Sequence, residues 1–195
     1  MTEGQVKGLI AGSVRLSQAL KSARDYTPLA NSPLSPERLY GVVADYARRH
    51  PLAGRLLKDL LTIPASERTY GQRIPVVIHG DFHARNYGFS GDELAAVFDF
   101  DKLTEGLACL DLVHALVWQF SRLGLPSSVR RRLAAVARAV AAQSPWPREE
   151  LVIACNVLRL AFAARRIEKH PHSAWVALDI LRRDRKIREL LTCLD

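Results

Sequence analysis

Two short apolar runs near the middle of the chain each lead into residues that can do acid–base or metal chemistry. The first run ends in a polar loop that contains Asp81 and Asn86, and the second ends on Asp99 and Asp101. Short runs rich in β-branched residues are typical of strands, and a strand can deliver reactive groups at its end. We therefore expect these two segments to form the functional centre of the molecule.

The residue types and their spacing favour phosphoryl transfer from a nucleotide. This reaction needs a carboxylate that orients or deprotonates the acceptor hydroxyl, and oxygen ligands that hold Mg²⁺ on the phosphates. Asp81 and Asn86 are separated by four residues, which is the spacing in the catalytic loop of kinases. Asp99 follows the next apolar run and precedes Phe100, as in the metal-binding motif of the same enzymes.

The sequence around these residues resembles the aminoglycoside phosphotransferase and choline kinase-like family of the protein kinase-like superfamily. The stretch His79–Asn86 matches the family pattern His-Gly-Asp-x-His-x-x-Asn. The stretch Phe98–Asp101 is similar to a later strand end of that family, and Asp111 matches an Asp near the start of the following helix. Three motifs in this order make the resemblance far more specific than an isolated Asp-x-Asp.

The resemblance implies a role for each residue that would take part in the reaction. Asp81 would be the catalytic base or hydroxyl-orienting carboxylate, and Asn86 and Asp99 would bind the metal ion. The implied cofactors are ATP, or another nucleoside triphosphate, and Mg²⁺. The implied acceptor is a hydroxyl group on a small molecule such as an aminoglycoside, choline or a sugar.

The other matched residues would support the loop around Asp81. His79 and Asp111 would brace this loop by hydrogen bonds, and His83 corresponds to the second His of the family pattern. Asp101 is an additional candidate, to which the resemblance assigns no definite role.

The implied fold is mainly α with a small β-hairpin element, similar to the C-terminal lobe of the protein kinase-like fold. We expect residues 1–35 to form an N-terminal helix and a linker rich in Pro and Ser, and residues 36–195 to form the kinase-like lobe. The segment before His79 shows no strand lysine of the kind that contacts the phosphates in the family's N-terminal lobe. The chain would then be a truncated enzyme, a lobe completed by an N-lobe-like chain or a second copy, or a non-catalytic binding module.

Hydrophobic periodicity and breaker residues predict the positions of the helices and strands. Helices are expected at residues 5–23, 36–50, 52–61, 111–123, 127–143, 148–169 and 173–192. Strands are expected at 76–79 and 94–99, joined through a turn at 88–92 as an antiparallel, hairpin-like pair. Gly4, Gly8 and Gly12 recur every four residues, which predicts either a face of small residues on the first helix or a poorly formed first turn.

Two other enzyme classes share part of the pattern. A haloacid dehalogenase-like phosphatase would use Asp99 as nucleophile and Asp101 as acid and base, but that fold needs parallel strands where this chain is predicted to be helical. A zinc hydrolase could use His79 and His83, which are four residues apart, but residue 80 is Gly where the H-E-x-x-H motif has Glu.

Composition and charge point away from several further classes. The net charge is +8, yet the basic runs at 130–132 and 182–186 contain no interleaved aromatic residues for base stacking, so we expect solvated helix faces and no nucleic-acid partner. Cys109, Cys155 and Cys193 form no Cys-x-x-Cys pair. The chain shows neither a signal-peptide pattern nor an apolar run long enough for a membrane span, so we expect no membrane partner and a cytoplasmic location.

Overall fold

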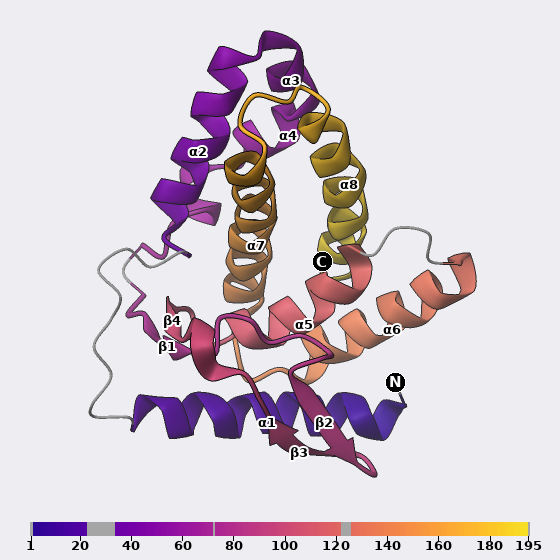
Figure 1. Cartoon of the computed structure of the whole chain (residues 1–195). Helices are drawn as coiled ribbons and strands as arrows, with labels where there is room; N and C mark the ends of the chain where they lie inside the picture. Colours follow the sequence, from indigo (N-terminus) through magenta and orange to yellow (C-terminus); the bar gives the residue numbers. More distant parts are fainter. Residues whose placement is uncertain (1, 23–33, 72, 122–125, 195) are drawn as a thin grey trace.

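Helices make up most of the chain in the computed structural model, which describes residues 2–22, 34–71, 73–121 and 126–194. The α-helices are α1 (Glu3–Lys21), α2 (Pro36–Arg49), α3 (Pro51–Leu56), α4 (Lys58–Leu61), α5 (Leu110–Ser121), α6 (Ser127–Gln143), α7 (Arg148–Lys169) and α8 (Val176–Leu194) (Figure 1). The strands are β1 (Val76–Ile78), β2 (Tyr87–Ser90), β3 (Glu93–Val97) and β4 (Thr104–Gly106), and the 3₁₀ turns are η1 (Ala65–Glu67) and η2 (Phe100–Lys102). A mainly α fold with small β elements is confirmed.

Prolines define the starts of four helices. α2 and α3 begin at Pro36 and Pro51, and α6 and α7 begin directly after Pro126 and Pro147. Proline is well suited to a helix start because its fixed φ is helical and its missing N–H would have no partner there. The predicted helix 148–169 is confirmed at both ends.

The helix predicted at 52–61 is wrong in one respect, because it is two short helices rather than one. Leu57, with φ −94° and ψ 13°, separates α3 from α4. A tertiary bend of this kind leaves the apolar periodicity intact, so the sequence pattern does not reveal it.

The pairing of the strands also differs from the prediction. β1 pairs antiparallel with β4 and β3 with β2, so the two strands predicted to form a hairpin lie in separate two-stranded sheets. The hairpin turn is Gly91–Asp92, since Ser90 pairs with Glu93 and Gly91 has φ +58°. Positive φ suits a two-residue hairpin turn, and this short turn leaves the chain from residue 87 onward free to form a strand.

Helix α1 lies directly against the β2–β3 hairpin (Figure 1). Its face of small residues allows this approach, because a Cβ atom on Gly4 or Gly8 would overlap Asp92, and one on Gly12 would overlap Leu94. The prediction of a small-residue helix face is therefore confirmed, and the hairpin that follows the loop 79–86 is held by this contact.

Helix α5 lies at the centre of the structure and contacts α1, α6, α7 and α8 (Figure 1). Ten of its twelve residues are buried, so it presents almost no face to solvent, and its polar residues Asp111 and His114 are inside the protein.

Within the described residues, no helix combines the length and apolarity needed to cross a membrane.

Helices α7 and α8 are joined by a buried ion pair. The guanidinium of Arg159 donates from Nε to Asp184 Oδ1 at 2.7 Å and from Nη2 to Asp184 Oδ2 at 3.0 Å. Both side chains are 5% exposed. A bidentate geometry and a further donation from Arg159 to Asn156 at 2.7 Å satisfy the charges inside the protein.

Candidate functional site

The loop His79–Asn86 is fixed to the first turn of α5. The carboxylate of Asp111 accepts the backbone N–H of His79 at 2.8 Å with one oxygen and that of Gly80 at 3.0 Å with the other. Burial raises the pKa of the Asp111 carboxyl above its ordinary value, while these two N–H groups act in the opposite direction and favour the charged form. The bracing predicted for Asp111 is thus a pair of direct backbone hydrogen bonds.

Gly80 is required by a close approach of two backbone segments. It has φ +76°, and a Cβ atom there would overlap the carbonyl oxygen of Lys102 and lie 3.0 Å from the Thr104 methyl group. The loop and the segment after Asp99 can therefore lie side by side only if residue 80 has no side chain.

His79 joins the loop to the end of β3. Its Nδ1 accepts the backbone N–H of Asp81 at 3.3 Å, so the ring proton is on Nε2, which donates to the carbonyl oxygen of Phe98 at 2.7 Å. The ring is fully buried. His79 thus connects the backbone of Phe98, the residue before Asp99, to the backbone of Asp81.

Asp81 is half-buried and keeps its carboxylate close to two donors. Its Oδ1 lies 3.6 Å from His83 Nε2, and its Oδ2 lies 3.5 Å from Lys102 Nζ. His83 accepts the Arg85 N–H at Nδ1, so its Nε2–H faces Asp81, and its ring stacks on Trp118 with centroids 5.2 Å apart. Both contacts of the carboxylate are long for hydrogen bonds, which leaves room for a closer donor such as a hydroxyl group.

Asn86 and Asp99 lie at neighbouring points of the backbone. Asn86 donates from Nδ2 to the carbonyl oxygen of Asp81 at 3.0 Å, which turns its Oδ1 away from that carbonyl, and its own carbonyl accepts the N–H of Phe98 at 2.8 Å. Asp99 follows Phe98 and is the one non-glycine residue of the described chain with positive φ, at 61°. Such strained residues cluster at functional sites, where the surrounding structure holds them in place.

The Asn86 and Asp99 side chains fit a magnesium ion that is shared with a ligand. They offer one amide oxygen and one exposed carboxylate, and Mg²⁺ is commonly held by one or two protein oxygens together with water and phosphate. Across the described ranges, no group of three or more His, Cys, Asp or Glu side chains is arranged to hold a metal ion. The donor set is therefore that of a metal bound together with phosphate and not that of a self-contained metal cage.

Asp101 is exposed on η2 beside the site. The residue of η2 that contacts the predicted catalytic carboxylate is its neighbour Lys102, which the sequence pattern did not identify. A lysine one position beyond the acidic motif has no distinctive spacing, so only the three-dimensional structure reveals this contact.

The two alternative enzyme classes fit the structure poorly. A dehalogenase-like phosphatase with Asp99 and Asp101 needs a parallel sheet, whereas the strands within the described ranges form two antiparallel pairs. A zinc hydrolase needs His79 as a ligand, but both ring nitrogens of His79 are engaged with the backbone.

A cavity of about 330 Å³ opens beside Asp81. It is bounded by residues of α2, the loop 79–86, η2, α5 and α7, including Asp81, Lys102, His114, Phe162, Arg165 and Glu168. Burial lowers the pKa of His114 to about 4, so its imidazole is neutral at pH 7. This volume is at the lower end of the range for small-molecule sites.

His114 and Trp118 are site residues that sequence reasoning missed. They follow Asp111 by three and seven positions, which places all three side chains on one face of α5. That spacing is the signal that could have identified them, since the face that presents Asp111 to the loop must present these rings too.

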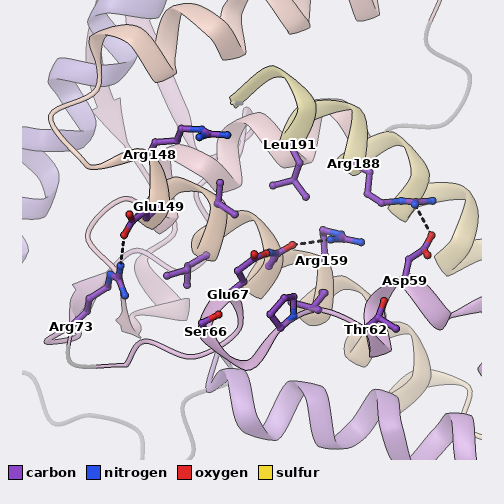
Figure 2. A pocket seen from close by; sticks show the side chains of 15 residues that line it. Asp59, Thr62, Ser66, Glu67, Arg73, Arg148, Glu149, Arg159, Arg188 and Leu191 are labelled. Carbon is purple, nitrogen blue, oxygen red and sulfur yellow. Dashed lines mark hydrogen bonds and ion pairs between the residues drawn. The ribbon is translucent and has the colours of Figure 1, made fainter.

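A larger cavity of about 800 Å³ lies between the α4–η1 segment, α7 and α8 (Figure 2). Four of its charged side chains form two ion pairs: Arg73 with Glu149 at 3.5 Å, and Arg188 with Asp59 at 2.5 Å. None of the residues that line it belongs to the loop 79–86. We therefore place the functional site at the smaller cavity, where the predicted reactive groups are.

Comparisons with known proteins bear on the family and the fold of the chain. A search of curated protein sequences gave no match. A solved structure of a protein assigned to the aminoglycoside phosphotransferases from Ralstonia eutropha shares 15% identity, with a TM-score of 0.51, over 98% of this chain and 64% of that one. A structure of amicoumacin kinase hAmiN in complex with AMP-PNP, Ca²⁺ and Ami shares 16% identity, with a TM-score of 0.49, over 96% of this chain and 60% of that one.

The present chain thus spans about six-tenths of the length of these solved proteins. The profile of the phosphotransferase enzyme family matches residues 15–150, which is more than half of the sequence and includes every predicted site residue. The chain therefore belongs to the phosphotransferase enzyme family.

Proposed function

We propose that this protein transfers the γ-phosphate of ATP, with Mg²⁺, to a hydroxyl group of a small molecule. The observation that carries the proposal is the position of the Asp81 carboxylate. It lies at the cavity of about 330 Å³, on a loop fixed by Asp111, and directly beside the backbone segment that holds Asn86 and Asp99.

In this proposal Asp81 acts on the acceptor. A hydroxyl group in the cavity would donate to the carboxylate, which orients the oxygen for attack and takes its proton. His79, His83 and Asp111 would act as positioning residues, because each holds the loop or faces the carboxylate without a place in the bonds that change. Fixed groups of this kind lower the barrier by holding reacting atoms in alignment.

Asn86 and Asp99 would hold the metal ion through Oδ1 and the carboxylate, respectively. When bound, Mg²⁺ neutralises the charge on the phosphates of the nucleotide. Asp99 has left-handed backbone and is exposed at the start of η2, so its carboxylate is accessible to a metal ion from solvent. ATP is the donor that the family membership supports, and its abundance in the cytoplasm is why we place the protein there.

A second candidate is a lobe that acts only with another polypeptide. Phe98 and Phe100 flank Asp99 and are 52% and 39% exposed, which is unusual for large aromatic side chains. Two exposed aromatic side chains next to a proposed metal ligand could contact a nucleotide base or a further chain. The completing chain would be an N-lobe-like polypeptide or a second copy of this protein. If no catalysis follows, the lobe would be a binding module.

The test is a phosphorylation assay with radiolabelled ATP and panels of aminoglycosides, amino alcohols, sugars and hydroxy acids. Because a general base contributes about 10²–10⁴-fold to the rate, Asp81→Asn should lower turnover by a factor in that range and leave nucleotide binding nearly unchanged. Asp45→Asn is the matched control, because Asp45 lies on α2 with its side chain 47% exposed and does not line the cavity. Turnover in Asp81→Asn that equals that of the unmodified protein would refute the assignment.

A further inference from the structure

The cavity beside Asp81 has no carboxylate that is available for a cationic acceptor. Glu168 lies 2.9 Å from Arg38 in an ion pair at the rim, so its charge is already compensated. Asp81 already lies near Lys102 and His83 and is assigned to the acceptor hydroxyl. Among the described lining residues there is no further acidic side chain.

One guanidinium in the same cavity is left without a carboxylate. Arg165 lines the cavity and is exposed, and within the described residues no carboxylate lies within 4 Å of it. In the larger cavity, by contrast, Arg73, Arg159 and Arg188 each pair with an acidic side chain. An unpaired guanidinium is a ready partner for a carboxylate, which it can bind through two parallel hydrogen bonds.

The wall also has an apolar part. Its apolar side chains include Leu39 of α2 and Leu158, Ala161 and Phe162 of α7. The neutral imidazole of His114 completes this surface without adding charge at pH 7. A ligand that fits here presents an apolar body to α2 and α7 and its polar groups to Asp81 and Arg165.

We propose that the acceptor is an anionic hydroxyl compound with an apolar body, namely a hydroxy acid whose carboxylate pairs with Arg165 and whose hydroxyl faces Asp81. This inference rests on the proposed phosphotransferase function and specifies its substrate class. The acceptor oxygen would form a bond to the γ-phosphorus, the bond from that phosphorus to the β–γ bridging oxygen would break, and the hydroxyl proton would go to Asp81. Polycationic acceptors are disfavoured, because the guanidinium of Arg165, which has no carboxylate partner among the described residues, would repel them.

The test compares three probes that share one phenylpropane skeleton and differ in charge: 2-hydroxy-3-phenylpropanoate, 3-phenylpropane-1,2-diol and 2-amino-3-phenylpropan-1-ol. Dissociation constants are measured by calorimetry on the full chain at pH 7.5 without nucleotide. A charge-assisted hydrogen bond at a partly exposed site should make the acid bind about tenfold more tightly than the amino alcohol, with the diol between them. Arg165→Gln should abolish most of this preference.

Arg132→Gln is the matched control, because it removes the same charge at a residue that is exposed on α6 and does not line the cavity. Equal or tighter binding of the amino alcohol, a preference unchanged in Arg165→Gln, or no binding of any probe would overturn the inference. Because nucleotide is omitted, the result is independent of catalysis. A retained preference for the acid in a chain that binds no Mg²⁺–ATP would support the inference and refute the proposed reaction.

Discussion

The carboxylate of Asp111 accepts the backbone N–H of His79 at 2.8 Å, across 32 positions of the sequence. The bond fixes the end of β1 to the start of α5 and therefore fixes the loop that carries Asp81. Its second oxygen takes the next N–H of the same loop at 3.0 Å. One buried side chain thus accepts two consecutive backbone N–H groups of the loop, and the geometry of the site depends on it.

Asp111→Asn should destabilise the protein, because an amide offers one acceptor oxygen and turns its own N–H₂ toward a backbone donor. Leaving a buried donor without a partner lowers the free energy of unfolding by about 2 kcal/mol. Urea denaturation of the variant measures this loss. Asp45→Asn, whose ion pairs are at the surface, should change stability by less than about 1 kcal/mol, and an equal loss in both variants would contradict the bracing role.

Gly80→Ala should cost more than Gly91→Ala, although both glycines have positive φ. Gly91 has no atom within 4 Å of an added Cβ, so only backbone strain of about 1 kcal/mol is expected. At Gly80 the methyl group would also overlap the Lys102 carbonyl, so we expect a loss of at least about 2 kcal/mol. Thermal denaturation of both variants compares them directly, and equal losses would show that the two segments separate easily.

His114 should make stability depend on pH. Burial lowers its pKa to about 4 in the folded protein, against about 6.5 in an unfolded chain. Between these values the unfolded state binds more protons, so the free energy of unfolding falls as the pH falls from 6.5 toward 4, by up to about 3 kcal/mol. His114→Gln should remove this contribution, whereas the exposed His172→Gln should not. The measurement is urea denaturation of the three proteins at pH 7 and pH 5. An identical change between the two pH values in all three would contradict the assignment.

Breaking the buried Arg159–Asp184 pair from one side should be strongly destabilising. Arg159→Met removes both short hydrogen bonds to the buried Asp184 carboxylate and leaves it only the longer contact with Arg188 Nε at 3.4 Å. Removing one partner of a buried pair costs about 3–5 kcal/mol. Arg130→Met removes an exposed pair with Glu189 and should cost less than about 1 kcal/mol. Chemical denaturation tests both. The double variant Arg159→Met/Asp184→Leu should be more stable than Arg159→Met, and a further loss instead would show that the pair is not the source of the effect.

Local sequence signals predicted most of the helices but not how the strands pair. Pro147 and a regular apolar period specify α7 at both ends, since both signals are contained in the helix itself. The turn predicted at 88–92 overlaps β2 at residues 88–90, because Gly88 and Ser90 are residue types of low strand propensity. The strand conformation of β2 comes from pairing with β3 and from the cover provided by α1, and both are tertiary effects.

In the candidate site, too, local motifs identified some residues, while others depend on how the helices pack. Motif order identified Asp81, Asn86, Asp99 and Asp111 as candidates, and the structure brings their segments together. The residues that shape the cavity were not identified. Arg165, for example, is separated from the motifs by two helices, and its approach to Asp81 depends on how α7 packs, which no local spacing encodes.

Calorimetric titration of the full chain with ATP, in the presence and absence of Mg²⁺, measures whether Asn86 and Asp99 form a metal site for a nucleotide. We expect Mg²⁺-dependent binding that weakens at least about tenfold in Asp99→Ala and persists in Asp45→Asn. Absence of binding at millimolar ATP, or equal binding by Asp99→Ala and the wild-type chain, would show that these two residues do not form such a site.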